Sequence, residues 1–410
     1  MSAAAPRVVV LTTGESHLPD AVREAGGEPV SFYLPPERLE GGVALAREWV
    51  ADVAQVSCAA EDFDALMIAA DEPADLAGLV VAAARLNLPT VVEPEGSSLS
   101  VALSALGLSP LGADPAETVV EISGSGRPRV RELVGEFSLA NALRAGISAG
   151  GGPEMIVHLT AIAREARAPG FLKMVRVLVP ETAVLAEPGS EWLTEHGTAG
   201  LLAHLGEAIH DGPTVEGRLL ENLPPAPPAP TPSGARLSLV RGRASGAEAL
   251  CRSSGEAEVS GDVRFFRSEK PAVQALEKER VEPGSLLVVG AAGPRSGPGL
   301  LRLDGLARVL DEEGLMGTLP VLTDGIAPDR AGGVWISLFT PETVEDGILS
   351  RLRDGDPLRI DLEEGRLRAG IVAREISDRH PRRLPERRDA GYAARYARSA
   401  RSAFEGAGFQ

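Results

Sequence analysis

The sequence predicts an α/β domain built on a parallel sheet, followed by a second domain of short strands that form a barrel. Two observations carry this prediction. In the first third of the chain, short apolar runs alternate with helical patterns, as in strands joined by crossover helices. Beyond a proline-rich stretch at residues 223–234, short β-rich runs separated by Gly and Pro dominate instead.

The first domain is predicted from apolar periodicity. The expected strands are residues 7–12 (RVVVLT), 64–70 (DALMIAA) and 89–93. The expected helices are residues 18–25, which end at Gly26-Gly27, and residues 39–56 and 75–86. Residues 138–210 have helical patterns only, and the clearest units are 154–167 and 198–210. We therefore expect a helical elaboration of the same domain.

Residues 223–234 read LPPAPPAPTPSG, which can neither continue a helix nor donate hydrogen bonds to a sheet. Proline stiffens such a segment into an extended spacer. We therefore predict an α/β domain over residues 1–223, a linker over 224–234, a barrel-like domain over 235–387 and a C-terminal helix over 388–410. The expected strands of the barrel are residues 236–240, 263–267, 285–290, 319–322, 334–338, 358–362 and 367–372, with a helix at 269–280.

The last segment, residues 387–408, reads RRDAGYAARYARSARSAFEGAG and is predicted to be one basic helix. Its arginines are expected to form a solvated face or to pair with the acidic body of the protein. Tyr392, Tyr396 and Phe404 fall at positions i, i+4 and i+12, so they could share one buried stripe. We expect this stripe to pack between domains and subunits.

Composition excludes several classes of partner. The 410 residues carry a formal net charge of −17, which opposes binding to nucleic acid or to an anionic membrane. The N-terminal residues lack a signal-peptide pattern and no long apolar run follows, so we expect a cytoplasmic protein.

Cys58 and Cys251 are too few for a disulfide framework and have no zinc-site spacing. Both are expected to be buried packing residues.

Ten segments carry a resemblance to a known family. They are VREAGG (22–27), FDALMIA (63–69), AAARLNLPT (82–90), ALGLS (105–109), HLTAIAREA (158–166), GRLLENL (217–223), VEPGSLLVVGAAGPRSGPG (281–299), LTDG (322–325), LRDGDPLRIDLEEGRL (352–367) and GYAARYARSA (391–400). In these segments and their order, the sequence resembles the dihydroxyacid dehydratase and phosphogluconate dehydratase family. The resemblance implies a doubly wound α/β domain with a swivelling β-barrel domain, and an active site in the cleft between them.

The resemblance also implies an iron–sulfur cluster bound by three cysteines, whose thiolates are the soft ligands that such iron needs. The region of the first cysteine is shortened here to TTGESHLPD. The second and third cysteines align with Glu72 and Val101, and neither Cys58 nor Cys251 falls on a ligand position. We therefore expect this chain to bind no cluster and, more generally, no cofactor.

The family's magnesium site is also changed. The resemblance aligns its aspartate and its carboxylated lysine with Pro73 and Ala74. The glutamate that follows the family's Gly-Pro-Gly turn aligns with Arg302, whose positive charge would repel a metal ion. The family's serine base aligns at or near Pro328, which has no protonatable group.

Several polar residues remain as candidates for a site. Asp329, next to Pro328, could be a carboxylate base, although a turn aspartate is the simpler interpretation. Glu154 stands where the family has a polar asparagine, and His158 is as consistent with a core histidine as with a site residue. Glu72 belongs to a carboxylate cluster at a strand end, where helix capping is the favoured alternative. Ser296 begins a Gly-rich loop, SGPG, that could approach a phosphate or a carboxylate.

Two functional hypotheses follow from these residues and from the resemblance. The leading hypothesis is a degenerate family member without dihydroxy-acid dehydratase activity. It would act as a partner subunit, in a homodimer or with an intact dehydratase, or as a protein that binds a small carboxylic acid. The alternative is a cluster-free lyase or isomerase. Its catalytic residues would be Asp329, Glu72 and Glu154, and its substrate-binding residues would be Arg302, His158 and Ser296.

Overall fold

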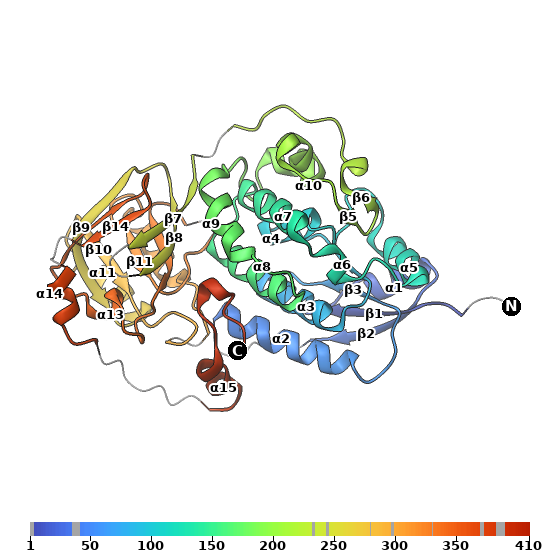
Figure 1. The fold of residues 1–410 in the computed structure, drawn as a ribbon, viewed down its shortest axis with the longest axis horizontal. Helices are drawn as coiled ribbons and strands as arrows, with labels where there is room; N and C mark the ends of the chain where they lie inside the picture. The colour runs from blue at the N-terminus through green and yellow to red at the C-terminus, as the bar shows by residue number, and fades with distance from the viewer. Residues whose placement is uncertain are drawn as a thin grey trace.

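The computed structural model describes residues 4–34, 42–231, 234–242, 246–278, 280–296, 299–329, 331–369, 373–382 and 390–410. It contains a four-stranded parallel sheet and a closed eight-stranded β-barrel. Figure 1 shows the sheet with most of the helices at one end of the molecule and the barrel at the other. The mixed α/β architecture with a barrel is therefore confirmed. The doubly wound arrangement and the domain boundaries stay predictions.

The parallel sheet has the strand order β2-β1-β3-β4. Its strands are β1 (Arg7–Thr12), β2 (Glu28–Tyr33), β3 (Ala65–Ala69) and β4 (Thr90–Val92). The expected strands at 7–12, 64–70 and 89–93 are present with nearly the same ends. Strand β2 was not expected, because it lies at the sheet edge with exposed or half-buried side chains and contains Pro29.

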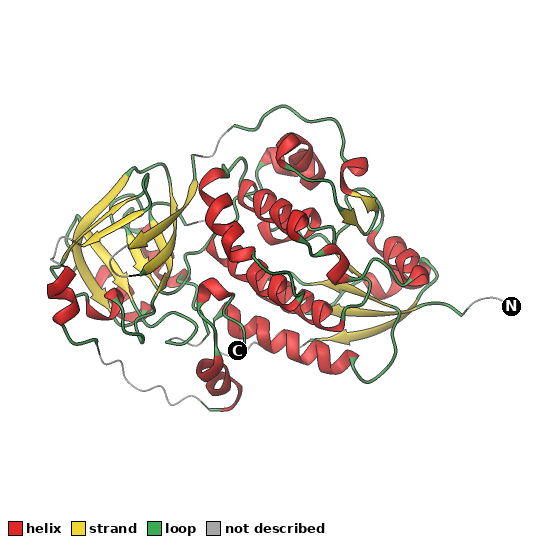
Figure 2. Cartoon of the chain, in the orientation of Figure 1, coloured by secondary structure: helices red, strands yellow, loops and turns green. Residues whose placement is uncertain are grey.

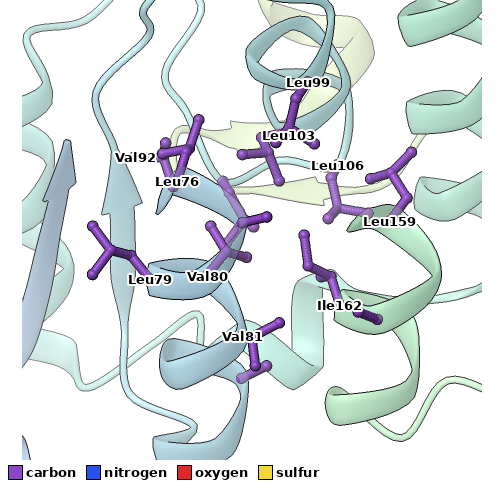
Figure 3. Close-up of a cluster of buried hydrophobic side chains, with 14 of the residues drawn as sticks. Leu76, Leu79, Val80, Val81, Val92, Leu99, Leu103, Leu106, Leu159 and Ile162 are labelled. Carbon is purple, nitrogen blue, oxygen red and sulfur yellow. The ribbon is translucent and has the colours of Figure 1, made fainter. Parts of the chain in front are cut away.

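Helix α3 (Pro73–Leu86) forms the centre of the α/β part, and every residue from 74 to 84 is buried. It begins two residues before the expected start because Pro73 takes the first helical turn. Figure 3 shows its apolar side chains beside those of β4, α4 (Ser98–Ala105) and α8 (Pro153–Glu165). Helix α2 (Val43–Cys58) crosses it at Gly78, where a Cβ atom would lie 2.6 Å from the carbonyl oxygen of Arg47. Residues 39–41 of the expected second helix lie outside the described residues.

Further helices complete this part of the molecule. They are α1 (Leu18–Glu24), α5 (Pro115–Ser125), α6 (Val130–Leu133), α7 (Glu136–Ser148), α9 (Phe171–Glu181) and α10 (Glu191–Leu205), with 3-10 turns η1 (Gly206–Ala208) and η2 (Leu219–Asn222) and a hairpin of β5 (Pro213–Thr214) and β6 (Gly217–Arg218). The expected helix at 198–210 was wrong at both ends. Ser190 caps α10 before a kink at Gly197, and the helix stops at Leu205. Among the described residues, no helix is both long and apolar enough to span a membrane.

The proline-rich linker passes over α10 before it reaches the barrel (Figure 1). The indole Nε1 of Trp192 donates a hydrogen bond of 2.9 Å to the carbonyl oxygen of Pro228. The rings of His196 and His204 stand edge-on to the same indole. The middle of the linker, and not only its two ends, is therefore attached to the helical part.

The barrel has the strand order β10-β11-β12-β8-β7-β14-β13-β9. Its strands form the yellow group at the left of Figure 2. Its strands are β7 (Arg236–Gly242), β8 (Ala247–Ser253), β9 (Glu258–Phe266), β10 (Ser285–Val289), β11 (Val321–Thr323), β12 (Trp335–Thr340), β13 (Pro357–Asp361) and β14 (Arg366–Ala369), with helices α11 (Glu269–Leu276), α12 (Asp304–Glu312), α13 (Ile348–Arg351) and α14 (Ala373–Asp378). The seven expected strands are present with shifted ends, although residues 370–372 lie outside the described residues. Strand β8 and helix α12 were missed. The expected helix at 269–280 ends at Leu276.

The C-terminal segment differs from the single expected helix. Helix α15 (Gly391–Ser399) is short, Ala400 is extended, and a 3-10 turn η3 (Ala403–Glu405) follows. Phe404 therefore does not continue the helical stripe of Tyr392 and Tyr396. Tyr396 and Phe404 are nevertheless buried in the α/β core of the same chain. The aromatic residues that suggested a subunit contact are thus covered within this chain. Residues 388–389 lie outside the described residues.

Candidate functional site

Four of the six candidate residues meet where α8 faces the barrel. Glu154 and His158 are one helical turn apart on α8, and Arg302 and Asp329 come from two loops of the barrel part. We call Glu154, His158, Arg302 and Asp329 the interface cluster. The α8 pair lies far from Arg302 and Asp329 in the sequence, and the packing of α8 against the barrel part brings them together.

Polar contacts link three members of this cluster, and one of them is an ion pair. Arg302 Nη1 lies 3.3 Å from Glu154 Oε2, and Glu154 Oε1 lies 3.5 Å from His158 Nε2. Burial opposes ionisation of Glu154, but His158 and Arg302 outweigh burial and keep the pKa of the carboxyl below its ordinary value. Burial lowers the pKa of His158. We conclude that a carboxylate and a neutral imidazole stand side by side.

Arg47 fixes the orientation of this imidazole. Its Nη1 lies 3.4 Å from His158 Nδ1, and a guanidinium can only donate, so Nδ1 accepts. The proton of the neutral ring is then on Nε2, which faces Glu154. Arg47 is fully buried and also donates to Glu48 and to the carbonyl oxygen of Gly406. The C-terminal segment therefore helps to hold Arg47 in place against His158.

Asp329 has a different environment from Glu154. Its Oδ1 is buried without a hydrogen-bond partner and lies 2.7 Å from the position that a Cβ atom at Gly152 would take. Gly152 is the N-cap of α8, so the carboxyl stands at the positive end of this helix. Burial and the neighbouring charge of Glu154 nevertheless raise the pKa of Asp329 to about 7, against the opposing effect of Arg252 and Arg302. Asp329 can thus gain or lose a proton near neutral pH, whereas Glu154 stays ionised.

A cavity of about 380 Å³ lies near the interface cluster, and two of its lining residues, Arg252 and Glu187, act electrostatically on Asp329. It is lined by Glu187, Pro188, Ala235, Arg252, Ser253, Ser254, Ala331, Gly332 and Gly333. Arg252 Nη2 lies 2.8 and 2.9 Å from the two carboxylate oxygens of Glu187, and its Nη1 donates to the carbonyl oxygen of Gly150. Arg252 is buried, whereas the Glu187 side chain is 32% exposed. Neither residue could be predicted from the sequence, because nothing in the local sequence marks Arg252 or Glu187.

Ser296 belongs to a separate group inside the barrel part. Its hydroxyl lies 3.2 Å from Asp324 Oδ2 and 3.1 Å from Glu342 Oε2. All three side chains are buried. Ser296 therefore has structural partners already and does not join the interface cluster.

Glu72 also lies apart from the interface cluster. It occupies the N-cap position of α3 without a side-chain capping bond, and its charge acts on Glu95. A cavity of about 610 Å³ opens beside it at the carboxyl ends of β1, β3 and β4, lined in part by Asp71, Glu93 and Glu95. Burial raises the pKa of Glu93 and of Glu95. Carboxylates alone do not define a ligand for this cavity.

The cysteines do not form a ligand set. Cys58 ends α2 in the α/β core, and Cys251 lies in β8 within the barrel core. Burial raises the pKa of Cys58 to about 11 and that of Cys251 to about 12, so both thiols stay protonated. Among the described residues, no group of three or more His, Cys, Asp or Glu side chains is arranged to hold a metal ion.

Comparisons with known proteins agree with the resemblance. Residues 227–407 match the family described as dihydroxy-acid/6-phosphogluconate dehydratase C-terminal. Dihydroxy-acid dehydratase 2 of Bordetella bronchiseptica is 30% identical over 353 residues, which cover 76% of this chain and 62% of the relative. The dihydroxy-acid dehydratase of Geobacter metallireducens is 28% identical over 351 residues, which cover 78% of this chain and 63% of the relative. The dihydroxy-acid dehydratase of Moorella thermoacetica is 25% identical over 493 residues, which cover 94% of this chain and 89% of the relative.

The match to the first two relatives spans less than two thirds of their length. The match to the Moorella protein runs through both the α/β part and the barrel part. These matches agree with the order of the matched segments, with the parallel sheet and with the closed barrel. The chain belongs to the dihydroxy-acid and 6-phosphogluconate dehydratase family.

Proposed function

We propose that this protein binds a small carboxylic acid in the cavity lined by Arg252 and Glu187, without the cluster-dependent dehydration of its family. The observation that carries the proposal is the pair of Arg252 and Glu187 at this cavity. A guanidinium that already holds one carboxylate can hold another of the same geometry. Glu187 is the more exposed partner, so it can turn toward solvent while Arg252 stays in place.

The size and polarity of the cavity agree with a small acid. A volume of about 380 Å³ lies at the lower end of the range for small-molecule sites. Asp329 does not line the cavity, but it interacts electrostatically with Arg252 and Glu187, which makes it the candidate to exchange a proton with a ligand hydroxyl. The relatives are named for dihydroxy acids, which makes short hydroxy and keto acids the first ligands to test. Arg302, by contrast, is engaged by Glu154 and Asp304.

The loss of cluster chemistry is part of the proposal. It is supported by the donor set, because two buried, protonated thiols in separate cores cannot provide three thiolate ligands. It is also supported by Arg302, whose positive charge stands where the family resemblance places a metal-binding glutamate. We also infer that the chain divides at the linker and that the α/β part is doubly wound, since the strand order β2-β1-β3-β4 fits this arrangement.

The alternative of a cluster-free lyase or isomerase is favoured by one observation. The pKa of Asp329 lies near 7 while Glu154 stays ionised, and such a divergence between two carboxyls is common in acid–base catalysis. Asp329 would then accept the α-proton of the bound acid. A role as a partner subunit, in a homodimer or with an intact dehydratase, rests on the family resemblance alone.

Titration calorimetry with lactate, glycerate and pyruvate tests the binding proposal. Arg252→Gln should weaken binding about 10- to 100-fold, since hydrogen bonds to a charged group contribute about 1.5–3 kcal/mol. Glu187→Gln should strengthen binding, because the internal competitor for Arg252 loses its charge. Arg308→Gln, which removes an exposed arginine of α12 paired with Glu312, is the matched control. Unchanged binding in the Arg252 variant would refute this assignment.

The same ligands separate binding from catalysis. Exchange of the α-proton of a bound acid in deuterium oxide, followed by proton NMR, should occur only if Asp329 acts as a base. Asp329→Asn would then abolish exchange and leave binding largely intact. Binding without exchange in the unmodified protein supports a binding protein and excludes this acid–base reaction for the acids tested.

A further inference from the structure

A group of arginines lies on the barrel part beside helices α13 and α14. Its members are Arg267, which follows β9, Arg353, which follows α13, and Arg382, which follows α14. We call these three residues the arginine patch. Figure 1 shows α14 at the end of the barrel that is remote from the α/β part. The patch is therefore separate from the interface cluster and from the cavity at Arg252.

Two guanidinium groups of the patch converge on one backbone oxygen. Arg353 Nη1 lies 3.0 Å from the carbonyl oxygen of Leu352, and Nε and Nη2 of Arg382 lie 3.2 and 2.9 Å from the same oxygen. The two cations are therefore close neighbours, and the acceptor between them is neutral. Both side chains are half-buried, which reduces the screening of their charges by water.

Further contacts hold the two side chains in fixed positions. Arg353 Nη2 donates over 2.6 Å to the carbonyl oxygen of His380. The guanidinium of Arg382 lies over the ring of Phe265, with Cζ 3.9 Å from the ring centroid, and its amide donates to the carbonyl oxygen of Ser350. Guanidinium groups that are already fixed lose little conformational entropy when they bind an anion.

The two carboxylates that act on Arg382 already have other partners. Asp354 Oδ2 lies 2.8 Å from Arg264 Nη1, and Asp356 accepts from Arg379 Nη1. Within the described residues, no member of the arginine patch forms an ion pair. The nearby carboxylates therefore neutralise other arginines and leave the patch with an excess of positive charge.

This excess affects the patch itself. Burial, with the charges of Arg353 and Arg267, lowers the pKa of Arg382, whereas Asp354 and Asp356 act in the opposite direction. All three guanidinium groups nevertheless stay charged at neutral pH. In the described part of the chain, Arg382 Nη1, Arg353 Nε and the guanidinium of Arg267 have no hydrogen-bond partner and are open to solvent. These donors are available to an anion.

We propose that the arginine patch binds a phosphate group, either as the free ion or as the monoester of a small molecule. Arginine forks hold phosphate oxygens through paired hydrogen bonds. A phosphate group carries a charge of about −1.5 to −2 at neutral pH, so it compensates more of the patch than one carboxylate can. The formal net charge of −17 favours a small ligand, because the rest of the protein repels a long polyanion. The site is independent of the proposed function.

Phosphorus-31 NMR titration of the whole protein tests the patch, with sodium phosphate and glycerol 3-phosphate as probes at constant ionic strength. Saturable broadening of the phosphorus resonance is expected. Tighter binding of glycerol 3-phosphate would identify a monoester as the ligand, and tighter binding of phosphate the free ion. Arg353→Gln and Arg382→Gln should each weaken binding about tenfold or more. Arg23→Gln, which removes an exposed arginine of α1, is the matched control and should leave binding unchanged.

Arg267→Gln keeps the test valid if the other two variants fail to fold, because Arg267 is exposed and makes no hydrogen bond within the described residues. It should weaken binding several-fold. Arg252→Gln should leave phosphate binding unchanged, and Arg382→Gln should leave lactate binding unchanged, which separates this site from the proposed function. The absence of saturable binding, equal affinity in all three patch variants and the unmodified protein, or phosphate binding that depends on Arg252 would each overturn the proposal.

Discussion

Tyr396 provides the sharpest test of how the C-terminal segment is used. The ring is 1% exposed in the α/β core, and its hydroxyl donates to the carbonyl oxygen of Ala407. Tyr396→Ala should reduce the free energy of unfolding by about 3–5 kcal/mol, the usual cost of removing a buried aromatic ring. Tyr396→Phe should cost about 1 kcal/mol, because only the hydroxyl and its hydrogen bond are lost. Against a typical total of about 5–15 kcal/mol, the first change is large and the second is small.

Urea unfolding followed by circular dichroism gives both values by linear extrapolation. Tyr392→Phe is the matched control, because its hydroxyl reaches Asp52 on the surface of α2 and its loss should cost less than about 1 kcal/mol. The loss of stability caused by Tyr396→Ala should not depend on protein concentration, because the ring packs within its own chain. A loss below about 1 kcal/mol, or a loss that changes with protein concentration, would refute packing of this ring within the chain.

Three further outcomes are expected. Asp329→Asn should reduce the loss of stability between pH 5 and 7 in urea titrations. A raised pKa means that this carboxyl contributes stability when protonated, and the contribution is lost as the pH rises toward 7. Trp192→Phe should speed cleavage of the linker by proteinase K several-fold, because the hydrogen bond to Pro228 is lost, and an unchanged rate would show that the linker is not held there. The purified protein should be colourless, contain no stoichiometric iron and form no keto acid from 2,3-dihydroxy acids with added magnesium. Visible absorption with matching iron and sulfide, or keto acid above a heat-killed control, would contradict this.

The sequence predicts those parts of the fold that have a strong local signal. Strand β1 is a run of buried apolar residues, and α3 is apolar on every face, so both are visible from composition and periodicity. Strand β2 has no such run because it is a half-exposed edge strand. The end of α15 was misplaced because Ala and Arg at 400–401 favour a helix, whereas the pairing of Ala400 with Phe409 imposes an extended backbone. Tertiary contacts outweighed local propensity there.

The candidate site could likewise be predicted only where the local sequence or the family resemblance gave a signal. Glu154 and His158 could be grouped from their spacing of four on one helix, and the family resemblance pointed to Arg302 and Asp329. Arg252 and Glu187 come from β8 and from the segment between α9 and α10, and only the packing of the two parts brings them together. Ser296 was expected near a ligand because it begins a Gly-rich loop. Its hydroxyl instead lies between two buried carboxyls that are remote in the sequence.

Arg302 and Asp329 are joined by one short segment of chain. Asp329 lies on the segment after β11, and Ile326, three residues before it, forms an isolated bridge with Arg302. The charge of Arg302 also lowers the pKa of Asp329. A change that withdraws Arg302 would therefore make Asp329 hold its proton more tightly, so the protonation of the candidate site depends on the position of a single arginine.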